Sequence, residues 1–344
     1  MMPKHSWRQL KDLENAIGIR LTHIIAERVS ADKEVEMKPG IYDNLPEMDY
    51  HGGAGLSAST LVEMGRSPAH CKAKLDGLRE KRTRALDLGQ ALHCAVLEPE
   101  RFPTAYIEAP NPLDPQYAGV IPVADVKLKE HCKALGITGY SKLKKDDLKQ
   151  AILEVAPDTR FWDEVVAEVE AAATVLSEND MDLCRGVMAS VQNHDKASKA
   201  FSKGVAERSI YWEDAETGLL CRGRMDYYRE DLGIIFDLKS CLDARYSKFQ
   251  KDILNYHYHQ KASWYLDGCR ALGLPANGFA WLAIEKEQPY AIGLYMASDE
   301  MLQLGRSEMR LMLNQFAECQ NSGIWPGYPD EFCTIELPEW ARAA

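Results

Sequence analysis

Two aspartates and a lysine, Asp226, Asp237 and Lys239, form the pattern in this sequence that is best suited to chemistry. The segments around the two aspartates alternate like strands and are separated by turn residues near 230–232, which predicts an antiparallel hairpin. Asp226 then lies roughly opposite residue 236 or 237, so the two carboxylates share one face of the hairpin. Carboxylates this close repel each other unless a cation lies between them, and oxygen ligands favour Mg²⁺ or Mn²⁺.

Lys239 follows Asp237 by two residues and therefore shares its strand face. Its ammonium group could orient or deprotonate an attacking water and balance the charge of a phosphate. The three side chains together predict metal-assisted hydrolysis of a phosphodiester. The alternative is a solvated hairpin in which Lys239 forms an ion pair with one exposed aspartate. The apolar run over residues 234–236 favours burial, and a buried carboxylate needs a partner or a metal.

Two further side chains could complete a metal site. His93 lies on a helix predicted over residues 84–98, one turn after Gly89, and its imidazole could bind the metal or be a core histidine. Glu207 begins the first strand of a predicted β-meander and is either another ligand or a charge at the edge of the sheet. The residues alone leave both alternatives open.

Arginines and a helix flank the acidic pair. Arg222 and Arg224 precede Asp226 at intervals of two on the same strand face, where they could bind phosphates bidentately or neutralise the acidic pair. Gln260 and Tyr265 lie on the helix predicted after the meander, where their side chains could reach the metal site. The aromatic residues of that helix fit core and rim positions better than a platform for stacking bases.

A mixed α/β core must position these residues. The Gly- and Pro-rich residues 37–55 predict a loop, and the Pro-rich residues 105–124 predict a linker. Thr60 and Glu63 have the spacing of a capping box, which predicts a helix that begins near Thr60, and Pro68 opens the next helix. The remaining predicted elements are helices over 84–98 and 160–203, strands at 207–214, 219–229 and 234–241, a helix over 246–272, strands at 277–285 and 290–296, and a helix over 298–321.

Composition limits the possible functions. The chain of 344 residues has 41 Lys and Arg against 52 Asp and Glu, a net charge of −11, so nucleic-acid binding would need a local basic path or a metal. No apolar run of about 18 residues predicts a membrane span, and the N-terminus lacks the apolar stretch of a signal peptide. Nine cysteines without a CxxC pair favour reduced thiols in a cytoplasm over a zinc knuckle or a disulfide framework. No P-loop motif is present.

The assembled motifs resemble the RecE-type exonucleases (exonuclease VIII) of phages and prophages, which belong to the RecB-like branch of the PD-(D/E)xK nuclease superfamily. The matching stretches cover most of residues 38–342, and the most specific are HCAVLEPERF at 93–102, RGRMD at 222–226 and FDLKS at 236–240. The resemblance implies a restriction-endonuclease-like core, which is a mixed β-sheet flanked by helices.

The resemblance also implies a site and an activity. His93, Asp226, Asp237 and Lys239 match the family's catalytic histidine, two metal-binding aspartates and catalytic lysine, and the backbone carbonyl of Leu238 is a further ligand of Mg²⁺, for which Mn²⁺ may substitute. The implied activity is ATP-independent 5′→3′ digestion of linear double-stranded DNA, which leaves a 3′ single strand for a single-strand-annealing recombinase partner. Members tend to form ring-like homo-oligomers that thread DNA ends, and the protein would be encoded by a phage or prophage and act in the bacterial cytoplasm.

One departure from the family pattern concerns the helix after the meander. The family usually carries Gln four residues before a Tyr, but Lys261 lies four residues before Tyr265 and Gln260 lies one residue earlier. A shift by one residue rotates a helical side chain by about 100°. The side chain of Gln260 is therefore expected to point in a different direction from that of the family's glutamine, and its role does not follow from the resemblance.

A second departure is a lysine-rich segment that looks inserted at residues 125–156. Between residues 125 and 153 seven lysines oppose four acidic residues, and two short amphipathic helices flank a GITGYSKL turn. The segment is similar to SAP-like or Rho-N-terminal-like modules, which often bind nucleic acid. We expect its lysines to hold DNA phosphates, and the alternative is a solvated face on a protein-docking module. The lysines concerned are Lys142, Lys144, Lys145 and Lys149.

The sequence therefore predicts three regions and one main function. The regions are an N-terminal helical or disordered extension at 1–36, a nuclease domain at 37–344 and the inserted module at 125–156. The predicted function is that of an Mg²⁺-dependent exodeoxyribonuclease that does not interact with a membrane. The alternatives are another nuclease of the superfamily, specific for single strands or for DNA structure, and a non-catalytic DNA-binding subunit.

Overall fold

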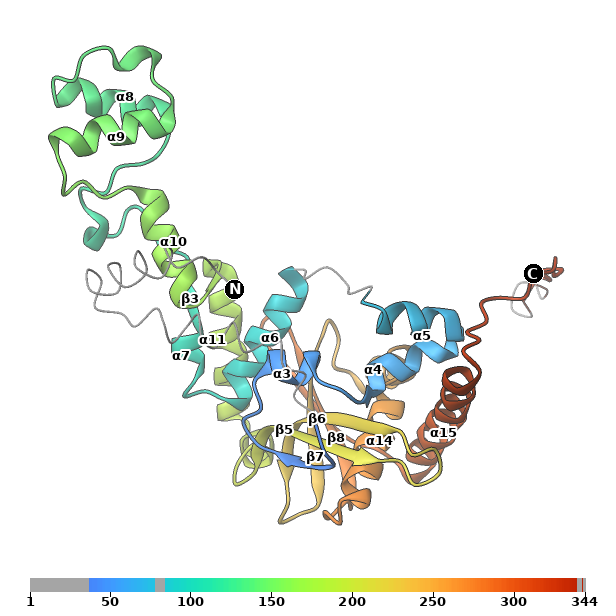
Figure 1. The fold of residues 1–344 in the computed structure, drawn as a ribbon. Coiled ribbons are helices and arrows are strands. Elements are labelled where there is room, and N and C mark those ends of the chain that lie inside the picture. Colours follow the sequence, from blue (N-terminus) through green and yellow to red (C-terminus); the bar gives the residue numbers. More distant parts are fainter. Residues whose placement is uncertain (1–36, 78–83, 339–341, 343–344) are drawn as a thin grey trace.

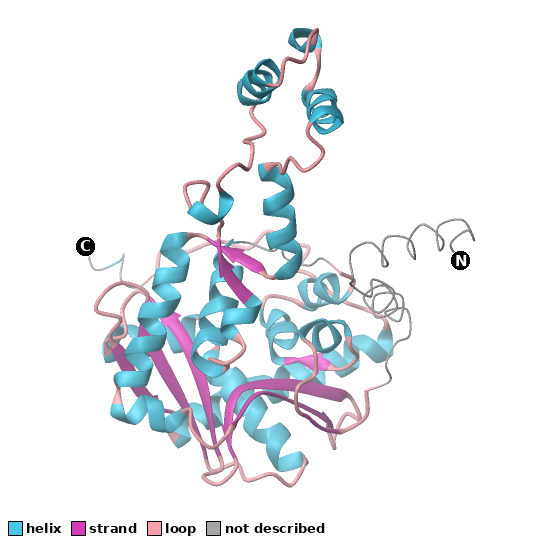
Figure 2. Cartoon of the chain, turned by 90° about the vertical axis from the view of Figure 1, so that its left-hand side faces the viewer, coloured by secondary structure: helices cyan, strands magenta, loops and turns pink. Residues whose placement is uncertain are grey.

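The computed structural model describes residues 37–77, 84–338 and 342, so the extension predicted over residues 1–36 lies outside the described residues. In this part of the chain a mixed sheet of seven strands has the order β1-β5-β6-β7-β8-β9, with β2 paired to β6. Helices cover both faces of this sheet (Figures 1 and 2), which confirms the predicted α/β class. The strands are β1 (Gly40–Tyr42), β2 (Leu56–Ser57), β5 (Val205–Glu213), β6 (Leu220–Arg229), β7 (Ile234–Cys241), β8 (Gly278–Glu285) and β9 (Ile292–Met296).

The predicted β-meander is the centre of the sheet. β5, β6 and β7 are antiparallel neighbours, and Tyr227 of β6 pairs with Phe236 of β7. The chain then crosses over through α13 (Tyr246–Asn255) and α14 (Tyr258–Ala271), so β8 joins β7 in parallel and β9 closes the edge antiparallel to β8. The single helix predicted over 246–272 is therefore two helices, because His257 between them adopts a left-handed backbone with φ of 58°.

Apolar side chains pack on both faces of the sheet. On one face α14 and α15 (Asp299–Ser322) pack over a cluster that contains Met225, Trp281 and Met309. On the other face α6 (Arg84–Leu97) and α11 (Glu178–Asn193) pack over a cluster that contains Leu92 and Leu238. A sheet buried on both faces leaves no solvent for a polar side chain at its centre, so such a side chain must be paired inside the fold.

Helix boundaries test the predictions from capping residues. Pro68 opens α5 (Pro68–Leu75) as predicted. The helix predicted to begin near Thr60 begins earlier, as α4 (Ala58–Leu61), because the Ser57 hydroxyl accepts the backbone N–H of Thr60 at 3.3 Å and so caps the helix itself. The further helices are the 3₁₀ turns η2 (Val62–Gly65) and η3 (Pro115–Tyr117), with α7 (Phe102–Ala105), α10 (Trp162–Ala172) and α12 (Asp195–Ala200).

Two segments predicted as irregular contain regular structure. Residues 37–55 were expected to be a loop, but they contain β1 and α3 (Glu47–Gly52). The predicted linker at 105–124 contains β3 (Tyr106–Glu108), which pairs in parallel with β4 (Thr174–Leu176) in a small second sheet. These elements are three to six residues long, and each strand is defined by a partner far away in the sequence.

Residues 125–155 form a small unit, which we call the α8–α9 unit. It contains α8 (Asp125–Ala134), the 3₁₀ turn η4 (Tyr140–Lys142) and α9 (Lys145–Val155). It has a cluster of fully buried side chains of its own, separate from the clusters on the sheet. Figure 1 shows the unit beyond α10, projecting away from the sheet. The cluster consists of Leu128, Cys132, Leu148 and Ile152 with the flanking Ile121 and Phe161.

The structure also bears on the cysteine and membrane predictions. All nine cysteines are free thiols, and eight of them are buried or half-buried. No helix among the described residues combines the length and the apolar character that a membrane span requires.

Candidate functional site

The two aspartates of the predicted hairpin meet inside the sheet. The pairing of Tyr227 with Phe236 continues toward Asp226 on β6 and Asp237 on β7. Both side chains are buried, and Asp237 is only 1% exposed. The backbone N–H of Leu238 donates a hydrogen bond to Asp226 Oδ2 at 3.0 Å, which fixes this carboxylate against the neighbouring strand. The solvated-hairpin alternative is therefore wrong.

Lys239 lies between the two carboxylates, as its position on the strand predicts. Its Nζ forms an ion pair with Asp237 Oδ2 and lies 3.8 Å from Asp226 Oδ2. The same ammonium group donates to the backbone carbonyl of Leu238 at 3.3 Å and lies 5.1 Å from the centroid of the Tyr258 ring. The carbonyl that the resemblance assigns to a metal thus faces the site and contacts a cation here.

A second ammonium group, that of Lys261 on α14, faces the same pair. Its Nζ donates to Asp237 Oδ1 at 3.0 Å and lies 3.6 Å from Asp226 Oδ1. The sequence analysis did not assign this residue to the site. The signal that could have identified it was present, because Lys261 occupies the position four residues before Tyr265 at which the resembling family carries Gln.

The charges of the cluster are mutually stabilised. Burial alone would raise the pKa of Asp226, but the ammonium groups of Lys261 and Lys239 lower it below the ordinary value. Burial opposes the charged form of Lys261 as well, yet Asp226 and Asp237 raise its pKa well above the ordinary value. The charged forms of Asp226 and Lys261 are therefore favoured together in a buried place, and strongly shifted pKa values of this kind are typical of functional sites.

His93 approaches the cluster from α6. Its Nδ1 lies 3.7 Å from Asp226 Oδ2. Burial lowers the pKa of His93, and the opposing attraction of Asp226 does not cancel this effect. The imidazole is therefore neutral at physiological pH, which is the form that binds metals.

Glu207 is a third carboxyl group near the site. It lies on β5 with a positive φ of 50°. Burial, followed by the negative charge of Asp226, raises the pKa of Glu207 to about 8. The dependence of this pKa on Asp226 indicates that the Glu207 carboxyl group lies near the acidic pair, and its role as a ligand stays a prediction.

Arg222 and Arg224 contact backbone carbonyls rather than the acidic pair, and their binding of phosphates stays a prediction. Arg222 donates to the backbone carbonyls of Tyr50 and Gly53 (2.6 Å to Gly53). Arg224 donates to the carbonyl of Leu45 at 2.7 Å, and both guanidinium groups lie over the Tyr50 ring. Within the described chain neither forms an ion pair with the two aspartates, because both side chains are long enough to reach the segment around α3 and fix it to β6.

Gln260 and Tyr265 have different positions on α14. The Gln260 amide donates to Glu308 of α15 at 2.8 Å, so the expectation that it reaches the acidic pair is wrong. The one-residue shift turns it toward α15 and brings Lys261 to the carboxylates instead. Tyr265 does reach the site, since its ring centroid lies 5.2 Å from Lys261 Nζ. It also packs so closely on Gly223 that a Cβ there would lie 2.7 Å from the ring.

These donors are suited to a divalent metal. Two carboxylates, a neutral imidazole and a backbone carbonyl are the ligand types that Mg²⁺ or Mn²⁺ accepts. The buried Oδ2 of Asp237 contacts Lys239 only as an ion pair and accepts no hydrogen bond among the described residues. In the same part of the chain no three His, Cys, Asp or Glu side chains converge on one point, and the ammonium groups of Lys239 and Lys261 contact both aspartates instead.

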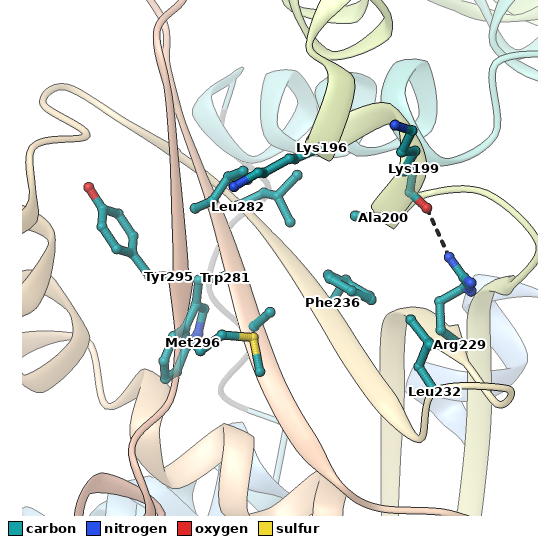
Figure 3. Close-up of a pocket in the computed structure, with 12 residues that line it drawn as sticks. Lys196, Lys199, Ala200, Arg229, Leu232, Phe236, Trp281, Leu282, Tyr295 and Met296 are labelled. Carbon is teal, nitrogen blue, oxygen red and sulfur yellow. Dashed lines mark hydrogen bonds between the residues drawn. The ribbon is translucent and has the colours of Figure 1, made fainter.

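A cavity of about 400 Å³ lies elsewhere, against β9 (Figure 3). Phe236, Leu282 and Met296 contribute apolar walls, with Lys196 of α12 at its edge. None of the acidic or basic side chains of the candidate site lines it. The chemistry-bearing cluster is thus a separate feature, built into the sheet and α14.

Comparison with known proteins places the chain in a family. No curated protein matches it. One solved structure, that of a candidate exonuclease from Eubacterium rectale, shares 13% identity with a TM-score of 0.49, covering 88% of this chain and 99% of the other. A family model matches residues 57–336, which is most of the chain and includes the whole candidate site. The chain therefore belongs to the family described as PDDEXK-like domain of unknown function (DUF3799).

Proposed function

We propose that this protein is a divalent-metal-dependent nuclease that hydrolyses phosphodiester bonds of DNA. The observation that carries the proposal is the buried pairing of Asp226 and Asp237 with Lys239 placed between them. A scaffold has no physical need for this arrangement, because a buried ion-pair network is costly compared with apolar packing. Membership of a PDDEXK-like family supports the same chemistry.

Different residues of the chain would have different roles in such a reaction. Asp226 and Asp237 would hold the metal, with the neutral imidazole of His93 and the carbonyl of Leu238 as further donors. When bound, Mg²⁺ supplies stabilisation of the charge that develops on the phosphate. Lys239 would position or deprotonate the attacking water and balance charge at the phosphate. The buried position of Asp237 keeps bulk water away from one side of the site.

We infer a linear double-stranded DNA substrate, degraded 5′→3′ without ATP to leave a 3′ single strand. The support is the resemblance of the HCAVLEPERF, RGRMD and FDLKS stretches to the RecE-type exonucleases. The same resemblance supports a ring-like homo-oligomer, a single-strand-annealing partner and a phage or prophage origin. Because the net charge of the protein is −11, we expect its DNA binding to depend strongly on the metal and on the salt concentration.

The α8–α9 unit is proposed as a second contact with DNA. Lys142 and Lys144 are exposed near the turn between its helices, and within the described chain neither forms an ion pair. Lys145 is only loosely paired, 3.9 Å from Asp163. Lys149, in contrast, is not among the lysines that we propose to contact DNA, because it forms ion pairs with Asp163 at 3.0 Å and with a neighbouring glutamate.

The test is digestion of linear duplex DNA labelled at the 5′ or the 3′ end, with Mg²⁺ or with EDTA. We expect early release of the 5′ label that requires Mg²⁺ and is abolished in Asp237→Ala. Asp182→Ala, which removes an exposed aspartate of α11, is the matched control and should digest DNA normally.

Other outcomes select the alternatives. Early release of the 3′ label, or digestion restricted to single-stranded or nicked DNA, would indicate a nuclease of different specificity at the same site. Full activity of Asp237→Ala would refute the site. Binding without cleavage of any DNA, even with Mg²⁺ or Mn²⁺, would identify a non-catalytic DNA-binding subunit.

A further inference from the structure

The candidate site holds one more cation than the proposed hydrolysis uses. Lys239 contacts the Oδ2 atoms of Asp226 and Asp237, whereas Lys261 contacts their Oδ1 atoms. Each ammonium group thus bridges the two carboxylates from its own side. A divalent cation held by the two carboxylates would compete with these ammonium groups for the same oxygen atoms.

The surroundings indicate which group leaves. The Lys239 side chain is 13% exposed and is held additionally by the Leu238 carbonyl. The Lys261 side chain is 30% exposed, and apart from the two carboxylates its ammonium group contacts only the face of the Tyr265 ring among the described residues. Lys261 therefore has fewer contacts to lose and a shorter way to solvent.

Electrostatics point in the same direction. In the metal-free protein the two aspartates and two lysines balance to zero charge. A divalent cation added beside both lysines would be repelled by two neighbouring positive charges in a buried place, where charge–charge interactions are strong. Withdrawal of the Lys261 ammonium group toward solvent removes part of this repulsion and leaves Lys239, which the proposed reaction uses, in place.

We propose that Lys261 is a built-in competitor of the metal. It holds the two carboxylates together in the metal-free protein and is displaced when a divalent cation binds. The inference rests on the proposed function, because it assumes that the acidic pair is a metal site. Two properties follow: Lys261 weakens metal binding, and it stabilises the protein when no metal is present.

The experiment compares Mn²⁺ binding by wild type and Lys261→Met in the absence of DNA, by isothermal titration calorimetry and by electron paramagnetic resonance. We expect the Kd for Mn²⁺ to fall by about tenfold or more in Lys261→Met, because a nearby positive charge is removed. Lys251→Met, which removes an exposed positive charge from α13, is the matched control and should bind Mn²⁺ as wild type does.

Thermal unfolding supplies a second readout. In EDTA, Lys261→Met should have a lower Tm than wild type, because its two buried carboxylates keep only Lys239 as a cation. Mn²⁺ should then raise the Tm of Lys261→Met more than that of wild type. If Lys261→Met does not fold without metal, Lys261→Gln removes the same charge and keeps a hydrogen-bond donor, so the binding comparison can be made with that variant.

The outcomes separate this inference from the proposed function. If wild type binds Mn²⁺, Asp237→Asn does not, and the two Lys261 variants bind no more tightly than wild type, displacement is overturned and the metal site stands. If neither wild type nor the Lys261 variants bind Mn²⁺, both the inference and the metal-dependent function are overturned.

Discussion

Two lysine-bearing regions of this molecule differ in what surrounds their ammonium groups. Lys239 and Lys261 are enclosed with two buried carboxylates between β6, β7 and α14. Lys142 and Lys144 are exposed at one end of the α8–α9 unit, on helices that have a small core of their own. In the metal-free protein the first pair of charges is held by the two buried carboxylates, and the second pair is surrounded mainly by water.

This difference suits the buried lysines to catalysis and the exposed lysines to electrostatic attraction of DNA. A charge held at a fixed distance inside a buried cluster can position one reacting group, because its interactions are strong and its geometry is set. An exposed lysine attracts any phosphate within the screening distance of about 10 Å and fixes none. We therefore expect changes in the buried region to alter rate and metal binding, and changes in the α8–α9 unit to alter affinity and salt dependence.

The largest expected effect is that of Lys239→Gln. Without the ammonium group the attacking water is neither positioned nor deprotonated, so the initial cleavage rate should fall by about a hundredfold or more. Mn²⁺ binding should persist, since both carboxylates remain. Label release from linear duplex DNA measures the rate, with Lys251→Gln on α13 as the control. An unchanged rate would remove Lys239 from the mechanism.

The α8–α9 unit should show a smaller effect of a different kind. Replacing Lys142, Lys144 and Lys145 together by Glu should weaken DNA binding by about tenfold at low salt and flatten the plot of affinity against salt. The cleavage rate at saturating DNA should not change. Fluorescence anisotropy at several salt concentrations, with Asp237→Ala in both backgrounds to prevent digestion, measures the affinity and its salt dependence. Label release by the proteins that keep Asp237 measures the cleavage rate.

The control for that change lies in the same unit. Lys127 and Lys129 already form ion pairs with Glu130 at 2.9 Å and Asp125 at 2.8 Å. Reversing these two charges should affect DNA binding less per residue than reversing those of Lys142, Lys144 and Lys145, which are unpaired or only loosely paired. Equal effects per residue would show that only net charge matters, and no effect of either change would favour a protein-docking unit.

Sequence analysis located most of the buried region because its signals are local. Alternation and a short turn identify β6 and β7, and they place Asp226 roughly opposite residue 236 or 237 without knowledge of the rest of the fold. The observed pairing of Tyr227 with Phe236 agrees with this register. The helix that carries His93 was found from its apolar stripe and the following proline, and α6 ends at Leu97 accordingly.

The parts that the sequence did not reveal depend on distant partners. β1 and β3 are strands only because β5 and β4 pair with them. The position of Lys261 at the carboxylates depends on how α14 is rotated over the sheet, which its own residues do not specify. For Arg222 and Arg224 the strand face was predictable, but their actual partners lie around α3, in a segment predicted as a loop.

The smallest expected effect concerns Glu207, the carboxyl group near the site that forms no ion pair within the described residues. Burial and Asp226 raise its pKa to about 8 from the ordinary value of 4.5. Between these two values the folded protein holds a proton that the unfolded chain has lost, so this group makes the free energy of unfolding fall as pH rises. Glu207→Gln cannot lose that proton, and its unfolding free energy should fall less over the same range.

Urea unfolding in EDTA at about pH 5.5 and about pH 8 measures the difference. Glu213→Gln, which replaces an exposed glutamate at the other end of β5, is the control and should follow wild type. If Glu207→Gln followed wild type as well, Glu207 would be charged in the folded protein, and the ammonium groups of the buried region would have to neutralise three carboxylates rather than two.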